Sequence, residues 1–332
     1  MKKIVALPLL ADPRMGGWPT YTAHLAHGLI SAGWEPVIFR LAKRSEKKPR
    51  HFGRGLDYWN ISFNDLLELT HTVPTLITAV GKNHRETARD LMAEGANVVI
   101  HDPTELDAMM REAISVTKVF TIRKIISDNL KKIGIDNQYL PHPYQRATPV
   151  DSKLEKHAVS LSRVDFDKNT HLIVEANKLL PEDKRIVIHG ALNRLYAKFK
   201  LEETDPRWWD NYAGEWPASE STSAPLRIAN SANMVIDLST IKNDGGGTQY
   251  SFLEVFDAGK PLVIHSGWLT GNPDYDEIAP AVYCAVDSPE SLAEAVMGEP
   301  SYDKSEAEII LNTHEAGNVA RNLMEAMLDA SG

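Results

Sequence analysis

Cysteine is almost missing from this 332-residue chain, and long apolar runs are missing altogether. The single cysteine, Cys284, excludes an internal disulfide and any zinc site built on several cysteines. No window approaches the ~18 uncharged apolar residues that a membrane-spanning helix needs. Neither half has a G-x-G-x-x-G after its first strand, which argues against an NAD-dependent enzyme. No H-E-x-x-H or comparable histidine spacing occurs, so we expect no bound metal.

The composition is that of an ordinary globular protein, with 43% hydrophobic and 24% charged residues. A chain of this length accommodates two domains. Residues 1–11 briefly look like a signal peptide, but Pro8 and the following Asp12-Pro-Arg14 favour a first core strand. We therefore expect a cytoplasmic protein.

The net charge of −9 is distributed unevenly along the chain. Residues 1–150 carry 20 Lys and Arg against 15 Asp and Glu, whereas residues 151–332 carry 16 against 30. The basic first half is where an anionic partner is expected to bind.

Strand and helix patterns alternate in both halves, which predicts an α/β protein with parallel sheets. In the first half we expect strands at 4–10, 34–39, 76–80, 97–100 and 116–121. The Pro-rich stretch 139–149 is typical of a linker. Strands at 158–161, 185–189, 234–238, 261–265 and 281–285 follow, with irregular structure over 205–225 and a long helix over 305–330. The predicted domains are 1–150, 151–304 and a C-terminal helical segment, 305–332.

Two cations lie between the strand at 158–161 and the helix expected from Leu172 to Leu180. Arg163 and Lys168 on a strand-to-helix loop are suited to binding a diphosphate at a helix N-terminus. This segment resembles the donor-binding loop of GT-B glycosyltransferases, in which Arg and Lys neutralise the leaving nucleotide diphosphate. Ser162 and Asn169 stand where that family usually has Gly. The alternative is a surface loop with two solvated cations.

A second block runs from Ile241 to His265 and contains three consecutive glycines, which allow a phosphate to approach the backbone. Its Leu-Glu-Val-Phe-Asp-Ala-Gly-Lys-Pro run is similar to one in retaining GT-B enzymes. The resemblance assigns the ribose to Glu254, the second Glu of a Glu-x7-Glu motif. The position of the first Glu of this motif is occupied by Gly246. The contact to the donor sugar is therefore missing or is made by Asp244. Alternatively, the block is a Gly-rich turn capping a buried helix. The donor-binding residues expected from both blocks and from the first loop are Gly16, Gly17, Arg163, Lys168, Asp244, Gly246, Gly247, Thr248 and Glu254.

His101 and Asp102 directly follow the apolar strand at 97–100, and ligand sites in open α/β sheets lie at such strand ends. A His-Asp pair at this point is similar to that of phage DNA α-glucosyltransferases. The resemblance implies that His101 contacts the donor sugar and that Asp102 orients the acceptor hydroxyl or takes its proton. Alternatively, Asp102 or Thr104 only caps the next helix.

The segment from Arg40 to Arg54 has seven cations and one acid in fifteen residues. Such density matches a phosphate-backbone footprint, although a solvated loop is the ordinary interpretation. The candidate nucleic-acid-binding residues are Arg40, Lys43, Arg44, Lys47, Lys48, Arg50 and Arg54. In contrast, the two D-x-D sequences at 165–167 and 274–276 are interpreted as coincidental.

The resemblance as a whole implies a GT-B fold with two Rossmann-like domains. It implies a retaining transfer of a sugar from a UDP-sugar, without a cofactor or metal. The favoured acceptor is a hydroxymethylated pyrimidine in double-stranded DNA, in the host cytoplasm if the protein is phage-encoded. Two alternatives stay open: a glycosyltransferase for a cell-surface glycan or lipid, and a non-catalytic two-domain protein that binds a sugar nucleotide.

Overall fold

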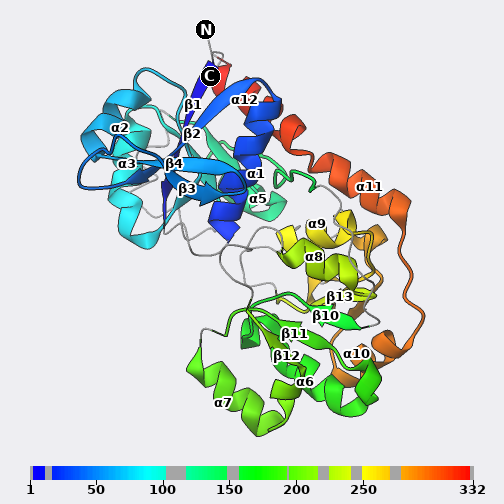
Figure 1. Ribbon diagram of the computed structural model, residues 1–332. Helices are drawn as coiled ribbons and strands as arrows, with labels where there is room; N and C mark the ends of the chain where they lie inside the picture. The colour runs from blue at the N-terminus through cyan, green and yellow to red at the C-terminus, as the bar shows by residue number, and fades with distance from the viewer. Residues whose placement is uncertain are drawn as a thin grey trace. The chain divides into compact units, whose positions relative to one another are not determined.

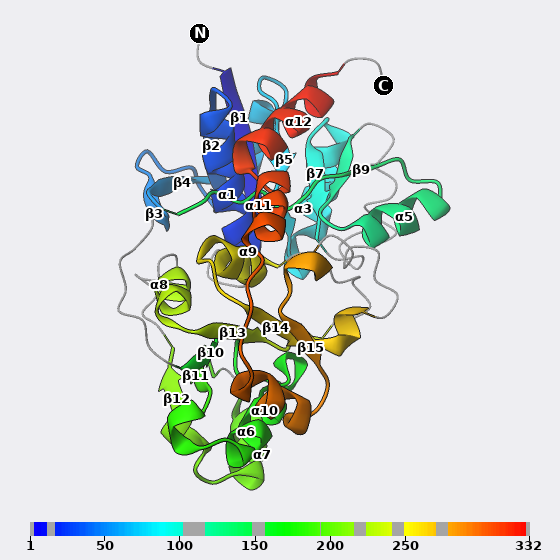
Figure 2. The same ribbon diagram turned by 90° about the vertical axis from the view of Figure 1, so that its right-hand side faces the viewer.

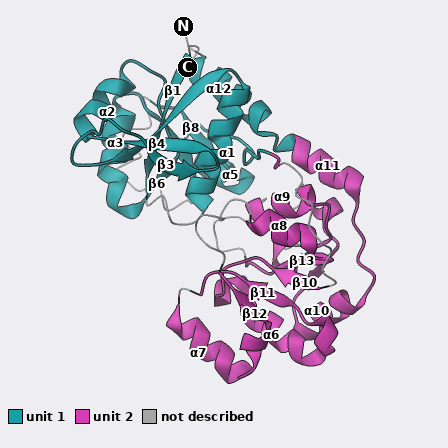
Figure 3. Cartoon of the chain, in the orientation of Figure 1, with its two compact units in different colours: residues 1–145, 313–332 teal, residues 146–312 magenta. Residues whose placement is uncertain are grey.

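The computed structural model describes residues 3–11, 17–101, 117–147, 157–192, 194–215, 224–240, 249–269 and 278–329. The chain divides into two compact units, one formed by residues 1–145 with 313–332 and the other by residues 146–312 (Figure 3). Each unit has its own sheet structure, and each buries its own apolar core.

The first unit holds a five-stranded sheet in the order β3-β4-β2-β1-β6 and a four-stranded sheet in the order β5-β7-β8-β9. A bridge from Ala6 to Thr75, just before β5, connects the two. Except for the antiparallel β3–β4 hairpin, the paired strands run parallel. The strands are β1 Lys3–Leu10, β2 Trp34–Leu41, β3 Arg50–Gly53, β4 Leu56–Ile61, β5 Leu76–Ile77, β6 Ala79–Val80, β7 Asn97–Ile100, β8 Val119–Thr121 and β9 Gln138–Tyr139.

Helices α1 Gly17–Ser31, α2 Phe63–Thr70, α3 Arg85–Ala93, α5 Lys124–Lys132 and α12 Ala316–Leu328 belong to this unit. Helix α1 buries Tyr21, Leu25 and Leu29, which recur every four residues on one face. The chain leaves α1 through Gly33, whose φ of 84° lies in the left-handed region that favours glycine.

The second unit is built on one six-stranded sheet in which every pair is parallel. Its strands are β10 Ala158–Ser160, β11 Val187–His189, β12 Tyr212–Gly214, β13 Met234–Asp237, β14 Leu262–His265 and β15 Cys284–Val286. Their spatial order is β12-β11-β10-β13-β14-β15, so the direction of winding reverses between β10 and β13. Crevices outside the carboxyl ends of strands at such a reversal are where open α/β sheets bind ligands.

Helices of the second unit are α6 Thr170–Leu179, α7 Leu195–Thr204, α8 Ala224–Ser231, α9 Tyr250–Asp257, α10 Pro289–Met297 and α11 Lys304–Thr313. The core includes Ile173 of α6, Ile236 of β13 and Leu292 of α10, all fully buried. Every helix among the described residues is too short or too polar to cross a lipid bilayer.

The structure differs from the sequence-based expectation in four elements. The strand expected over 76–80 is two short strands in different sheets, and the basic segment 40–54 contains β3. The stretch expected to be irregular contains the edge strand β12, and the helix α8 begins at its end. The expected helix over 305–330 is two helices, because the Glu315 carboxylate accepts the Gly317 and Asn318 N–H groups and starts a new helix there.

Helix α11 lies in the second unit, whereas the sequence pattern placed most of it in the C-terminal segment. Its Glu308 pairs with Arg146 at 2.6 Å. Helix α12 returns to the first unit and packs along α1 (Figure 1 and Figure 2). Two backbone hydrogen bonds hold the segment before α12. The Tyr144 N–H donates to the His314 carbonyl oxygen at 2.7 Å, and the Tyr144 carbonyl oxygen accepts from the Ala316 N–H at 3.1 Å.

Candidate functional site

The loop that carries Arg163 and Lys168 connects β10 to α6 and is held in a defined shape. Asn169 ends its 3₁₀ turn with a φ of 50°, and the Asn169 side chain donates to the Leu238 carbonyl at 2.8 Å. Asp165 and Thr170 exchange two hydrogen bonds at 3.1 and 3.0 Å. The Thr240 N–H donates to the Asp167 carbonyl at 3.0 Å. The loop is therefore fixed to the segment that follows β13.

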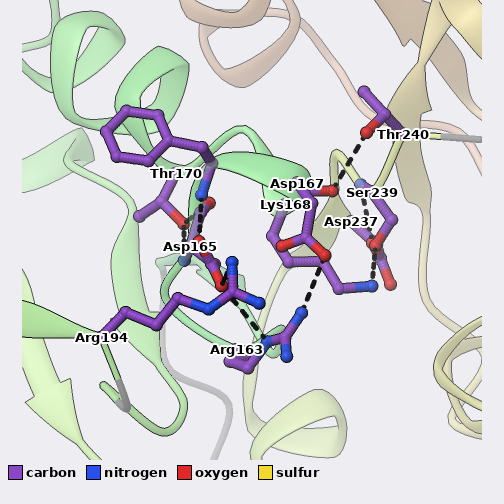
Figure 4. A network of polar contacts seen from close by, with 10 residues as sticks. Arg163, Asp165, Asp167, Lys168, Thr170, Arg194, Asp237, Ser239 and Thr240 are labelled. Carbon is purple, nitrogen blue, oxygen red and sulfur yellow. Dashed lines mark hydrogen bonds and ion pairs between the residues drawn. The ribbon is translucent and has the colours of Figure 1, made fainter. Parts of the chain in front are cut away.

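Arg163 lies between two carboxylates of its own loop (Figure 4). Its Nη2 is 2.8 Å from Asp167 Oδ2, and its Nε is 3.8 Å from Asp165 Oδ2. Asp165 is only 3% exposed and also pairs with Arg194, at 3.0 Å. These carboxylates hold the guanidinium beside the carboxyl end of β10 while more than a third of the Arg163 side chain stays exposed.

Lys168 is held by residues at the end of β13. Its Nζ donates to Ser239 Oγ at 2.7 Å, and the Ser239 hydroxyl donates to Asp237 Oδ1 (Figure 4). The other carboxylate oxygen of Asp237 accepts from Ser251 Oγ at 2.6 Å. Because Ser251 lies in the first turn of α9, one buried carboxylate connects the Lys168 loop to that helix.

These contacts bring both predicted cations to the winding reversal of the sheet. Arg163 follows β10, and Lys168 is bound by the residues that follow β13, the two strands between which the reversal lies. Both cations therefore lie near the carboxyl ends of these strands, where open α/β sheets bind ligands.

Gly190 allows a neighbouring loop to approach this site closely. Its φ is 141°, and a Cβ at this position would lie 2.1 Å from the Ser162 carbonyl oxygen. Only glycine fits such an approach of β11 to the residue preceding Arg163.

Glu254 lies on α9 and is partly buried. The other predicted residues of the glycine-rich block, Asp244, Gly246, Gly247 and Thr248, lie outside the described residues, as do Gly16 and Asp102. Gly17 is the exposed first residue of α1.

His101 directly follows β7 in the first unit. Its Nε2 is 2.8 Å from the Thr78 carbonyl oxygen, which can only accept, so Nε2 carries the proton. The ring meets Tyr21 edge-on at 4.8 Å. Burial, with a smaller contribution from the Arg123 charge, lowers the pKa of His101 to about 4. His101 is therefore a neutral imidazole at physiological pH, suited to hydrogen bonding rather than to charge pairing.

The cations of the basic segment are distributed over β2, the loop that follows it, β3 and the turn between β3 and β4. Lys43, Arg44, Lys47, Lys48 and Arg50 are exposed. Arg50 is engaged by Glu46 at 2.8 Å. Arg54 has a φ of 53°, and its carbonyl oxygen accepts from His27 Nε2 at 2.9 Å.

Arg40 lies instead in a pocket of about 330 Å³ within the first unit. The pocket opens where β1, β2 and β6 end and is lined by Leu9, Ala11, Trp18, Arg40, Leu41, Gly81, Lys82, Asn83 and His84. Trp18 and Phe52 of β3 pack against the same buried residues, Leu9, Ala11 and Ala79. The lining therefore combines the indole of Trp18 with the basic side chains of Arg40 and Lys82.

Within the described part of the chain, no three His, Cys, Asp or Glu side chains are grouped so that they hold a metal ion. Asp165 and Asp167, the first D-x-D pair, instead contact arginines. The second D-x-D pair lies outside the described residues.

No protein-family model matches the sequence, and no curated protein is significantly similar to it. Solved structures do match over nearly the whole chain. Anabaena Alr3699/HepE in complex with UDP aligns with a TM-score of 0.71 at 12% identity, covering 98% of this chain and 99% of that one. An alpha-glucosyltransferase in complex with UDP and a 13-mer DNA containing a HMU base aligns with a TM-score of 0.71 at 13% identity, covering 98% and 99%. AviGT4, a glycosyltransferase involved in avilamycin A biosynthesis, aligns with a TM-score of 0.62 at 13% identity, covering 98% and 97%.

The chain has the GT-B fold. The two-domain α/β architecture predicted from the sequence is thereby confirmed.

Four residues of this region were not expected from the sequence: Asp165 as an arginine partner, Arg194, Asp237 and Ser239. Lys168 and Ser239 are 71 positions apart, and Asp165 and Arg194 are 29 apart. The one available signal was Asp237-Leu-Ser239 at the end of an apolar strand, the position where ligand sites in α/β sheets form.

Proposed function

We propose that the protein is a glycosyltransferase that moves a sugar from a UDP-sugar to a hydroxyl acceptor. The observation that carries the proposal is the placement of two cations at the winding reversal of a GT-B fold, where carboxylates hold Arg163 directly and hold Lys168 through Ser239. A nucleoside diphosphate is the anion that fits two fixed cations at the carboxyl ends of parallel strands.

In the transfer, the bond from the sugar C1 to the diphosphate oxygen breaks, and a bond from C1 to the acceptor oxygen forms. Arg163 and Lys168 stabilise the charge that develops on the departing UDP. The ribose binds Glu254, and the phosphates also approach Gly16, Gly17 and the N-terminus of α9 after Gly247. Asp244, Gly246 and Thr248 complete the donor side. The anomeric configuration is retained.

His101 and Asp102 face the sugar and the acceptor. His101 contacts the sugar as a neutral imidazole, which is consistent with its low pKa. Asp102 orients the acceptor hydroxyl and takes its proton. No metal takes part in this scheme.

For the acceptor we propose a hydroxymethylated pyrimidine in double-stranded DNA. Five exposed cations of the basic segment support this choice, since they suit a phosphate backbone. The pocket that contains Trp18 and Arg40 supports it as well, because an indole and basic side chains suit an extruded base and its phosphate. One solved GT-B structure similar to this chain also contains DNA with a HMU base.

The test is nucleoside mass spectrometry on hydroxymethylcytosine and hydroxymethyluracil DNA after incubation with the protein and a panel of UDP-sugars. We expect one nucleoside to gain the mass of one sugar. Lys168→Ala should reduce the rate on the order of 10²-fold, the usual effect of removing one group that stabilises transition-state charge. Lys178→Ala, which removes a lysine of α6 that contacts the Thr204 carbonyl, is the matched control and should retain activity. Absence of both an adduct and free UDP with every donor would contradict the proposal.

A second candidate acceptor is an anionic lipid headgroup. Helix α7 exposes Leu195, Tyr196 and Phe199, at 74%, 66% and 58%. Lys198 and Lys200 lie among them, and an apolar face with cations suits a membrane surface. Release of UDP with anionic vesicles, but not with modified DNA, would favour this acceptor.

A further inference from the structure

We propose that Ser239 is a positioning residue whose hydroxyl, oriented by Asp237, holds the Lys168 ammonium in place for the donor diphosphate. This inference rests on the proposed function, because it assigns Lys168 to the diphosphate. Neither Ser239 nor Asp237 contacts the phosphates in this scheme, and both act through Lys168.

The direction of each hydrogen bond follows from the chemistry of the groups. An ionised Asp237 carboxylate can only accept, so the single hydroxyl proton of Ser239 is donated to Oδ1. Ser239 Oγ can then only accept from Lys168 Nζ, which lies at 2.7 Å. The ammonium has three N–H donors, so one is used by Ser239 and two are directed elsewhere. The contact therefore fixes the ammonium without consuming its capacity to bind phosphate oxygens.

Asp237 and Ser239 are buried, so the hydrogen bonds between them are not chance contacts at the protein surface. Asp237 is 3% exposed and Ser239 is 1% exposed. A carboxylate removed from water requires hydrogen-bond donors, and Asp237 accepts from the Ser239 N–H at 3.0 Å, from the Ser239 hydroxyl and from Ser251. All three donors are neutral groups, and the Ser239 hydroxyl connects this carboxylate to Lys168.

The same carboxylate also fixes the first turn of α9 through Ser251 Oγ at 2.6 Å. Helix α9 carries Glu254, the proposed ribose ligand. The diphosphate and ribose ends of the donor site therefore share one anchor.

The Ser239 hydroxyl can be removed without releasing the backbone around it. Ser239 N–H donates to Asp237, and its carbonyl oxygen accepts from Trp268 Nε1 at 2.7 Å. Trp268 is fully buried. The Ser239→Ala variant should therefore keep the backbone in place, and it removes the acceptor for Lys168 together with one of the three donors to Asp237.

The experiment is isothermal titration calorimetry with UDP and with uridine, on full-length wild type, Ser239→Ala, Lys168→Ala and the double variant. We expect Ser239→Ala to bind UDP about tenfold more weakly, the effect of removing one charge-assisted hydrogen bond, and to bind uridine like the wild type. In the Lys168→Ala background the same substitution should have no further effect on UDP binding. Ser231→Ala, which removes a serine hydroxyl bonded to a carbonyl of α8, is the matched control and should bind both ligands normally.

The outcomes separate this inference from the proposed function. If the wild type binds neither UDP nor another nucleoside diphosphate, the proposed function fails and the inference fails with it. If the wild type binds UDP and Ser239→Ala binds it equally well, only the inference is overturned. An equal weakening of uridine and UDP binding, or the same weakening of UDP binding in the Lys168→Ala background, would overturn it too, because Ser239 would then be acting on the fold rather than on the ammonium.

Discussion

At the residue scale, the first unit contains histidines whose surroundings disfavour the protonated imidazole. His24 and His142 are buried, and desolvation is the largest cause that lowers the pKa of each well below its ordinary value. The charge of Arg54 contributes for His24, and that of Arg123 contributes for both His142 and His101. All three imidazoles are therefore neutral in the folded protein near neutral pH.

This arrangement predicts a decrease in stability in mild acid. Between about pH 6.5, the ordinary histidine pKa, and about pH 4, the pKa of His101, the unfolded chain binds more protons than the folded one. Stability is then fully present above pH 6.5 and falls as the pH decreases, by up to ~1.4 kcal/mol per pH unit for each histidine. Urea unfolding at several pH values measures this slope.

The His142→Asn variant should lose less stability per pH unit, because it lacks one of the imidazoles that bind a proton only after unfolding. His51→Gln is the control, since His51 is exposed on β3. Equal slopes for the wild type and His142→Asn would contradict the account.

The sequence singled out the two loop cations, Arg163 and Lys168, but not the residues that hold them. Arg163 and Lys168 are recognisable because a polar loop with two cations joins an apolar strand to a helical pattern. In the sequence, Asp237 and Ser239 only mark the end of the apolar strand at 234–238. Their contacts join segments far apart in the sequence, which a local pattern does not reveal. Side-chain partners of this kind depend on the strand order, which local patterns do not specify.

At the scale of elements, the contact between α1 and α12 joins the first and the last helix of the described chain. A Cβ at Gly28 of α1 would lie 2.1 Å from the Ala316 carbonyl oxygen at the start of α12. The absence of a side chain at Gly28 lets the two backbones approach.

Gly28→Ala should therefore destabilise the protein by about 2 kcal/mol, because the cost of overpacking exceeds the gain in helix propensity. Gly17→Ala is the matched control, since a Cβ there meets nothing within 4 Å and the first residue of α1 can accept it. Thermal unfolding monitored by circular dichroism compares the two. A Gly28→Ala variant as stable as the wild type would show that α12 does not need this close approach.

Elements with a strong apolar period were predictable, whereas edge elements and breaks were not. The periodic residues of α1 and the continuous apolar run of β13 identify those elements. Strand β12 contains Tyr212-Ala-Gly214 and is an edge strand, paired with β11 alone among the described strands, so its sequence carries little apolar pattern. At the break between α11 and α12, Glu315 caps the new helix, and the neighbouring His314 contacts the carbonyl oxygen of His142, a distant residue, at 2.8 Å. Helical periodicity continues across that break and conceals it.

At the scale of the whole molecule, the net charge of −9 conceals a basic first half and an acidic second half of the chain. The exposed cations of the basic segment lie in the first unit, whereas most of the excess acid lies in residues 151–332. Binding of a polyanion to the first unit should then depend strongly on salt.

Reversing two of these charges tests that expectation. Lys47→Glu with Lys48→Glu should lower the slope of log Kd for DNA against log salt by about 2, roughly one for each phosphate that a lysine no longer neutralises. Lys131→Glu with Lys132→Glu, at the end of α5, makes the same charge change at exposed sites outside the basic segment and should leave the slope near that of the wild type. Fluorescence anisotropy over a salt range of about 50 to 300 mM measures both slopes. An unchanged slope in the first variant would exclude the basic segment as the DNA-binding surface.

The return of α12 to the first unit has a consequence for biosynthesis. A ribosome finishes residues 146–312 before it makes residues 313–332, so the second unit has its whole sequence while the first still lacks a helix. Domains fold as units during synthesis, and the unit that emerges first is therefore the one completed last. Until α12 arrives, the face of α1 around Gly28 has no cover, and the nascent chain passes through an interval in which that surface is open to chaperones.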